Sequence, residues 1–265
     1  MTYLDKIVAA HRTAAGADER SLDALIEEAR GSVARGSSAR RDFRGALVAS
    51  DGLGVIAEIK RRSPSKGDLA PDLDPAALAA LYRDGGATCL SVLTDVEHFG
   101  GSPDDLQAAR GAVDIPVLRK DFTVSEADVC DARIMGADCV LLIVAALSDD
   151  ELERFTALAR DLGLSVLVEV HDEPELDRAV AVGADIVGVN QRDLVTFEVD
   201  THRAERMAPL IPADVVKVAE SGVRDAIDAA RLAAAGYDAV LVGESLVTSG
   251  DPRGGVAAMR RAFQA

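Results

Sequence analysis

The stretch that decides the fold is residues 55–67, VIAEIKRRSPSKG. Its apolar residues predict a buried strand, which two charged residues, Glu58 and Lys60, interrupt. Because side chains two apart on a strand point the same way, Glu58 and Lys60 share one face. Burying a carboxylate and an ammonium is costly unless the two groups pair or serve a chemical purpose. We therefore interpret this strand and its basic Ser/Gly loop as one wall of an active site. A solvated edge strand is the alternative, which the apolar run disfavours.

From residue 55 onward, apolar strands alternate with amphipathic helices. Strands are predicted at residues 55–60, 88–93, 116–119, 139–143, 165–170, 186–189, 215–219 and 239–242. Helices are predicted at residues 75–84, 103–110, 126–135, 149–162, 174–182, 201–208, 224–235 and 254–263. In GADCV, GADIV and GYDAV, the Gly ends a helix and the Asp turns the chain into the next strand. Eight such units predict an α/β fold, the (β/α)₈ TIM barrel, with its chemistry at the carboxyl ends of the strands.

Residues 1–50 show helical patterns without a strand, and residues 31–41 look like a basic connection. This part is too short for a core of its own. We therefore expect a single barrel domain over residues 1–265, of which residues 1–50 are a helical extension. No fused partner domain is expected.

The composition restricts the possible partners. A net charge of −16 disfavours nucleic acid as a partner, so a local basic cluster must attract any anionic substrate. The chain has no apolar run long enough for a membrane span and no signal-peptide core. Its three cysteines show no metal-ligand spacing, and Cys89 and Cys139 are expected to be buried and inert. We expect a cytoplasmic protein without a bound metal.

Polar residues cluster where the predicted strands end. Lys120 and Asn190 follow the third and sixth strands, Glu169 lies at the end of the fifth, and Glu220 precedes Ser221 at the end of the seventh. Their chemical types indicate an acid–base site beside an apolar wall. The loops after the seventh and eighth strands are where barrels often hold phosphate, so we expect Ser221-Gly222 and Gly243-Glu244 to bind one.

Together these motifs resemble the indole-3-glycerol phosphate synthase family over nearly the whole chain. The matching segments are YLDKIV, AEIKRRSPSKG, SVLTDVEHFGGS, VLRKDF, GADCVLLIV, VLVEVH, GVNQRDL, VAESGV and VLVGESLV. The resemblance implies a (β/α)₈ barrel with an N-terminal helical extension. It also implies a carboxy-lyase of tryptophan biosynthesis, which closes 1-(2-carboxyphenylamino)-1-deoxyribulose 5-phosphate to indole-3-glycerol phosphate. Carbon dioxide and water are lost, and no cofactor is implied.

The resemblance assigns site residues by motif. The implied catalytic residues are Glu58, Lys60, Lys120, Glu169, Asn190 and Ser221. The implied substrate-binding residues are Ser63, Leu93, Phe99, Phe122, Leu141, Arg192, Leu194, Gly222, Gly243 and Glu244. Many relatives have Ser at the position of Glu244, so its backbone N–H is expected to serve and its side chain to point away.

The expected chemistry needs an acid and a base. Lys120 is predicted to be the general acid, with a pKa that burial lowers toward the working pH. Glu169 is the predicted base, and Lys60 is its rival for one proton transfer. The four histidines, His11, His98, His171 and His202, show no partner pattern. A phosphoribosylanthranilate isomerase or other sugar-phosphate barrel, and a non-catalytic metabolite-binding paralogue, are the alternative functions.

Overall fold

The computed structural model describes residues 2–34, 40–64 and 66–261, without the side chains of residues 32–34. Most of the predicted connection at residues 31–41 therefore lies outside the part whose side chains are described. Residue 65 of the first loop and the end of the last predicted helix, at residue 263, also lie outside the described residues.

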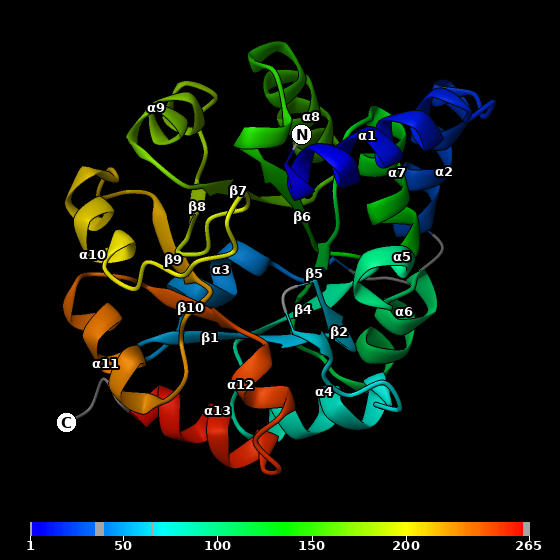
Figure 1. Ribbon diagram of the computed structural model, residues 1–265. Coiled ribbons are helices and arrows are strands. Elements are labelled where there is room, and N and C mark those ends of the chain that lie inside the picture. Colours follow the sequence, from blue (N-terminus) through cyan, green and yellow to red (C-terminus); the bar gives the residue numbers. More distant parts are fainter. Residues whose placement is uncertain (1, 35–39, 65, 262–265) are drawn as a thin grey trace.

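Eight parallel strands form a closed barrel, as predicted (Figure 1). Around the barrel their order is β1-β10-β9-β8-β7-β6-β5-β4. The strands are β1 (Gly54–Ile59), β4 (Cys89–Leu93), β5 (Val117–Lys120), β6 (Cys139–Ile143), β7 (Ser165–Val170), β8 (Ile186–Asn190), β9 (Val216–Glu220) and β10 (Ala239–Val242). A short antiparallel hairpin, β2 (Arg62–Ser63) with β3 (Gly67–Asp68), follows β1.

Helices surround the barrel. They are α4 (Pro75–Asp84), α5 (Val96–Phe99), α6 (Pro103–Ala112), α7 (Glu126–Met135), α8 (Asp149–Asp161), α9 (Glu173–Ala181), α10 (Arg203–Met207), α11 (Ala226–Ala234), α12 (Glu244–Val247) and α13 (Pro252–Arg261). Two 3₁₀ turns, η1 (Val144–Ala146) and η2 (Ala208–Leu210), lie among them. Every predicted barrel strand and helix is present, and each end that lies within the described residues is displaced by no more than two residues.

Capping residues explain where the helices begin and end. Ser125 starts α7 through a capping box with Asp128, and Asp225 accepts the amides of Ile227 and Asp228 at the start of α11. Because Asp225 caps the helix, α11 begins at Ala226 and not at residue 224, where it was predicted to begin. Gly136 ends α7 with φ at 98°, a conformation that favours glycine, so the predicted role of the GAD motif is confirmed there.

The core has two layers. Alternate strand residues such as Val55, Ala57 and Ile59 pack outward against the helices. The others, such as Ile56, fill the barrel interior together with Phe43 of α3 (Phe43–Val48). Cys89, Cys130 and Cys139 are buried free thiols, so the expected burial of Cys89 and Cys139 is confirmed. Among the described residues, no helix has both the length and the apolar composition that a bilayer span requires.

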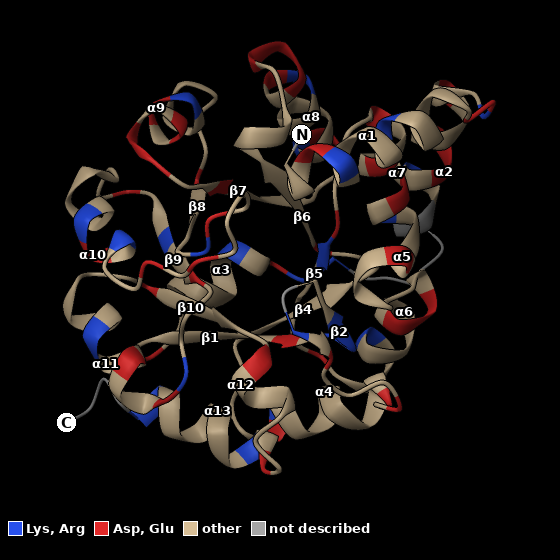
Figure 2. Ribbon diagram, in the orientation of Figure 1, with Lys and Arg blue, Asp and Glu red and all other residues tan. Residues whose placement is uncertain are grey.

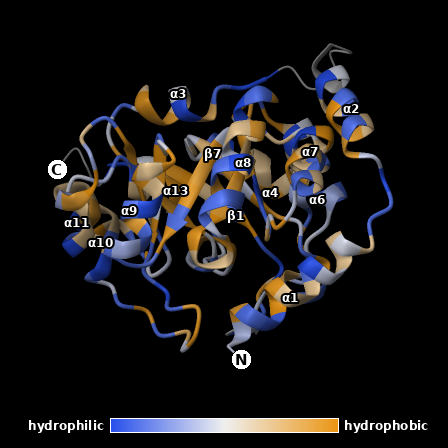
Figure 3. Ribbon diagram, turned by 90° about the horizontal axis from the view of Figure 1, so that it is seen from above, coloured by the Kyte–Doolittle hydropathy of each residue, from blue (hydrophilic) through white to orange (hydrophobic). Residues whose placement is uncertain are grey.

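The N-terminal helices lie at opposite ends of the barrel (Figure 3). Helix α3 packs at the end where the strands begin, with Phe43 and Leu47 in the inner core. Helix α1 (Tyr3–Gly16) lies at the other end, where Arg12 donates to the carbonyl of Ala146 and pairs with Glu151 at 2.7 Å. Between them, α2 (Leu22–Ala34) packs beside α7. Helix α1 therefore lies on the rim where chemistry is expected.

Candidate active site

A cavity of about 750 Å³ opens at the carboxyl ends of the strands. All of the residues that the sequence predicted for the site line this cavity. They are Glu58, Lys60, Ser63, Leu93, Phe99, Lys120, Phe122, Leu141, Glu169, Asn190, Arg192, Leu194, Ser221, Gly222, Gly243 and Glu244. Figure 2 shows basic residues at β5 and around β2 near the barrel axis, while acidic residues are spread over the outer helices. The cavity lining itself mixes the two signs: basic Lys60, Lys66, Lys120, Arg192 and Arg224 lie among acidic Glu58, Asp95, Asp121, Glu169, Glu220 and Glu244, so it is not the purely basic cluster that the sequence led us to expect.

The charged pair at the end of β1 points into the cavity, as the alternation predicted. Lys60 Nζ lies 2.7 Å from Glu58 Oε1. Glu58 is 4% exposed, so the pair is largely shielded from water. Ser91 also donates to Glu58 Oε2, at 3.4 Å. The alternative of a solvated edge strand is wrong, because β1 is buried along its whole length and pairs with β4 and β10.

Lys120 lies between two buried carboxylates. Its Nζ donates to Glu169 Oε2 and to Glu220 Oε2, each at 2.7 Å. Glu169 comes from β7 and Glu220 from β9, and each is 2% exposed. One ammonium from β5 therefore bridges carboxylates from β7 and β9, two strands that only β8 separates.

The expected fall in the pKa of Lys120 is wrong. Burial does lower it, but the negative charges of Glu169, Glu220 and Glu58 outweigh burial and hold the pKa of Lys120 above its ordinary value. From the sequence we expected apolar neighbours around Lys120, but in the structure its neighbours include the carboxylates of Glu169 and Glu220. Lys120 is therefore a stable ammonium at neutral pH.

The two carboxylates that share Lys120 differ in their ionisation. Burial raises the pKa of Glu169, but Lys120 and His171 reverse the effect and lower its pKa to about 2. Burial, reinforced by the charge of Glu169, raises the pKa of Glu220 to about 8 despite Lys120. Lys120, Glu169 and Glu220 form a charged trio. At pH 7 this trio carries one ammonium, one carboxylate and one protonated carboxyl group, an arrangement that separates an acid from a base.

Asn190 and its neighbours hold Glu169 in place. Asn190 Nδ2 donates to Glu169 Oε1 at 2.9 Å, and the Asn190 side-chain oxygen accepts the amide of Arg192 at 3.0 Å. Arg192 donates to the carbonyl of Phe197, within the loop after β8. His171 Nε2 lies 3.5 Å from Glu169 Oε1, so this histidine flanks the site.

The loops after β9 and β10 form the part of the cavity where phosphate is expected. Ser221 and Gly222 have φ values of 65° and 73°, so two successive residues take the left-handed conformation in the loop where barrels often hold phosphate. A Cβ on Gly243 would lie 2.4 Å from Glu58 Oε1, so the close approach of Glu58 requires glycine. The Glu244 side chain lines the cavity, is 38% exposed and has its Oε1 3.9 Å from Lys66 Nζ.

An apolar wall lies opposite these loops. It consists of Leu93, Phe99, Phe122, Leu141 and Leu194, which come from β4, α5, the loop after β5, β6 and the loop after β8. The rings of Phe99 and Phe122 have centroids 6.4 Å apart. The cavity therefore has one side suited to a phosphate and another suited to an aromatic ring.

Sequence reasoning missed three residues at or beside the cavity. Glu220 was noted at a strand end but given no role, although a carboxylate directly before Ser221 was a usable signal. A Cβ on Gly188 would lie 2.1 Å from Glu220 Oε1, which accounts for a glycine within β8. The histidines show no partner pattern in the sequence, yet the structure brings His11 and His98 together at Asp95. No local pattern links residue 11 with residue 95.

Comparison with known proteins gives a consistent result. The family model described as indole-3-glycerol phosphate synthase matches residues 4–259. A protein of that name from Nocardioides sp. (strain JS614) is 53% identical, and the match covers 98% of both chains. Another, from Mycolicibacterium vanbaalenii, is 52% identical over 97% of this chain and 93% of the relative. These matches favour neither the isomerase nor the non-catalytic alternative.

A solved structure shares the fold alone. Thiamine phosphate pyrophosphorylase from Pyrococcus furiosus superposes with a TM-score of 0.61 at 17% identity, over 84% of this chain and 98% of that chain. Identity this low supports the barrel architecture and nothing about chemistry. With the closed barrel, the charged trio in its mouth and the matches along nearly its whole length, the chain belongs to the indole-3-glycerol phosphate synthase family, the carboxy-lyases of tryptophan biosynthesis that form indole-3-glycerol phosphate.

Proposed function

We propose that the cavity binds 1-(2-carboxyphenylamino)-1-deoxyribulose 5-phosphate and that Lys120 and Glu169 carry the proton transfers of its ring closure. The observation that carries this assignment is the position of Lys120, 2.7 Å from both Glu169 and Glu220. The phosphate lies on the backbone N–H groups of Gly222, Gly243 and Glu244, with Ser63 nearby. The aromatic ring lies on the wall that includes Phe99 and Phe122.

Lys120 acts as the general acid. The ring carbon that bears the carboxylate forms a bond with the ketone carbon, and the ketone oxygen takes a proton from Lys120. The raised pKa of Lys120 suits this role, because the oxygen that receives the proton is developing into an alkoxide, which is itself strongly basic. The bond to the carboxylate then breaks, its electron pair restores the aromatic ring, and carbon dioxide leaves.

Glu169 acts as the base in the dehydration that follows. A second protonation releases the hydroxyl group as water, while Glu169 removes a proton from the neighbouring methylene carbon and the indole double bond forms. Glu169 is ionised for this task because Lys120 and His171 lower its pKa. Glu220, with its pKa raised to about 8, supplies the proton that recharges Lys120. One proton is consumed overall, because the anionic carboxylate of the substrate leaves as neutral carbon dioxide.

The remaining polar groups bind and orient the substrate. Lys60 holds the substrate carboxylate until it departs and is the alternative donor for one proton transfer. Glu58 keeps Lys60 in position and accepts from a substrate hydroxyl or from the anilino nitrogen. Asn190 fixes Glu169, and Arg192 braces the loop after β8. The extension of residues 1–50 belongs to the same domain, because α1 and α3 both contact the barrel.

The test is to incubate the purified protein with the substrate and follow indole fluorescence, with Lys120→Ala measured alongside. Production of fluorescence by the wild type and its loss in the variant are the expected results. A folded wild type that binds the substrate without turnover would point to the non-catalytic alternative. A wild type that neither binds nor reacts would point to another sugar-phosphate barrel.

A further inference from the structure

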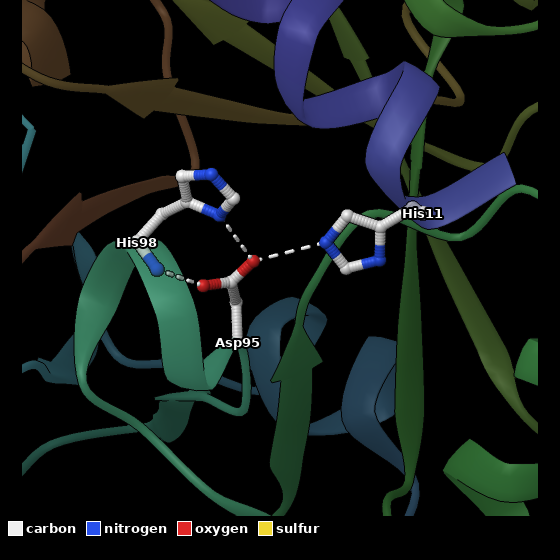
Figure 4. Close-up of side chains that lie close together, drawn as sticks. All are labelled: His11, Asp95 and His98. Carbon is white, nitrogen blue, oxygen red and sulfur yellow. Dashed lines mark hydrogen bonds and ion pairs between the residues drawn. The ribbon is translucent and has the colours of Figure 1, made fainter. Parts of the chain in front are cut away.

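A cluster of titratable groups lies beside the cavity without belonging to the catalytic trio (Figure 4). His11 of α1 places Nε2 at 2.9 Å from Asp95 Oδ2, and His98 of α5 places Nδ1 at 3.0 Å from the same oxygen. Asp95 is 5% exposed and lines the cavity. The N-terminal extension therefore contacts the active-site rim through one buried carboxylate.

Asp95 is also the residue that sets the position of α5. Its Oδ1 accepts the backbone amides of His98 at 2.5 Å and of Phe99 at 3.3 Å, which caps the helix. Phe99 belongs to the apolar wall. A group that holds Asp95 from outside therefore also fixes where Phe99 lies.

The His11 ring also touches the wall directly. Its centroid lies 5.3 Å from that of Phe122, whose ring neighbours Phe99. At the start of α1, the helix that carries His11, Tyr3 packs edge-on against His98 and against Phe197, another residue of the cavity lining. Helix α1 thus contacts the wall through His11 and the neighbouring cavity lining through Tyr3.

We propose that His11 is a positioning residue for the aromatic end of the substrate: its bond to Asp95 holds α5 and the Phe99–Phe122 wall in the binding geometry, and only its protonated form does so fully. This inference rests on the function proposed above, because it assigns the ring of that substrate to this wall.

The charges around His11 favour its protonated form. Asp95 lies at the end of β4, Asp121 at the end of β5 with Oδ1 at 4.0 Å from His11 Nε2, and Asp128 is on α7. His98 is the remaining titratable group in contact with Asp95, while Arg119 is paired with Asp121 at 3.0 Å. The hydrogen bond to Asp95 raises the pKa of His11 above 6.5, against the effect of burial. His11 therefore loses its proton, and the contact weakens, as the pH rises through that raised value.

A metal ion is the rival occupant of this cluster. The donor atoms of His11, Asp95 and His98 lie within 4.8 Å of one another and are types that zinc accepts. However, ligand atoms on one tetrahedral zinc ion are roughly 3.3 Å apart, as bond lengths of about 2.0–2.1 Å require. The observed 2.9 and 3.0 Å to a single oxygen are hydrogen-bond lengths, so the geometry favours protons.

The test measures kcat and KM from pH 5.5 to 9 for the wild type and for His11→Ala, His11→Gln and His11→Lys. We expect His11→Ala to raise KM about tenfold at pH 6.5 with kcat within about twofold, the scale of losing one charge-assisted hydrogen bond. His11→Gln keeps a neutral donor and should give an intermediate KM that no longer rises with pH. His11→Lys, whose charge persists across this range, should restore a low and pH-independent KM.

The matched control is His202→Ala, because His202 is exposed and pairs only with Glu205 among the described residues that surround it. It should leave KM and its pH profile unchanged. An unchanged KM in folded His11→Ala, or a His11→Lys profile that still rises like that of the wild type, would overturn the proposal. So would activity that is lost with EDTA, restored by Zn²⁺ and absent from both His11→Ala and His98→Ala, which would assign a metal instead.

The two proposals fail in different ways. If the wild type does not turn the substrate over, the proposed reaction fails. The same variants then report on His11 through equilibrium binding of the substrate, with the same expected order of affinities. If the wild type is active and the variants show no KM effect, only the role of His11 fails.

Discussion

Lys120 and Glu220 are joined by a hydrogen bond of 2.7 Å, although they lie one hundred positions apart in the chain. Glu220 shares this ammonium with Glu169, and burial, reinforced by the negative charge of Glu169, raises the pKa of Glu220 to about 8. The protonated carboxyl group of Glu220 is therefore part of the site at neutral pH.

The pH dependence of kcat should report Glu220. Below pH 8 Glu220 carries its proton, and above it the proton is lost, so kcat should fall as the pH rises through about 8. Glu220→Gln keeps an oxygen that accepts from Lys120 but cannot titrate, so this alkaline limb should disappear. An unchanged limb in Glu220→Gln would assign the titration to another group.

Glu220 should also affect stability. Its pKa rises from an ordinary 4.5 to about 8 on folding, so its contribution is fully present below pH 4.5 and is lost as the pH rises through 8. Urea unfolding at pH 6 and pH 9 should show a decline that is smaller in Glu220→Gln than in the wild type. Equal declines in the two proteins would contradict this prediction.

Removing the ammonium of Lys120 should abolish most turnover. Lys120→Ala takes away the proton donor and leaves Glu169 and Glu220 facing each other, so kcat should fall by about 10²–10⁴-fold, the usual range for a general acid. The control is Lys6→Ala, because Lys6 is exposed on α1. Rapid-quench or fluorescence assays should show near-normal turnover in the control, and near-normal turnover in Lys120→Ala would refute its role.

A methyl group at position 243 should disturb the pair on β1. The added Cβ of Gly243→Ala would lie 2.4 Å from Glu58 Oε1, so Glu58 must move away from Lys60. We expect kcat/KM to fall at least about tenfold, since misplaced catalytic groups are costly. Gly111→Ala is the matched control, because a Cβ there meets nothing within 4 Å. Equal activity in the two variants would show that Glu58 tolerates displacement.

Replacing the carboxylate beside the phosphate loops should improve substrate binding. Glu244→Ser removes a negative charge near the expected phosphate and releases Lys66, 3.9 Å away, to face that phosphate. KM should fall about two- to fivefold at low salt, and the gain should shrink at high salt because both side chains are exposed. Inorganic phosphate should inhibit the variant more strongly than the wild type. A higher KM would mean that the carboxylate itself serves binding.

Local sequence patterns predicted most of the architecture. The apolar runs and the Gly-x-Asp turns identified all eight barrel strands, because both depend on residues adjacent in the chain. Helix ends moved by one or two residues where a cap such as Asp225 selected the first turn. Glu58 and Lys60 were correctly placed on one face, since strand alternation depends on nothing farther away.

The sequence by itself determined the barrel, its active rim and the residue types on that rim. Only the tertiary structure decided how those charges interact. The pKa of Lys120 rises instead of falling because Glu169 and Glu220 arrive from other strands, and His11 acquires a partner because α1 lies beside Asp95 on the rim of the barrel. The physical reason is the range of each effect: periodicity and capping act between near neighbours in the chain, whereas electrostatic interactions depend on distances in space that closure of the barrel sets.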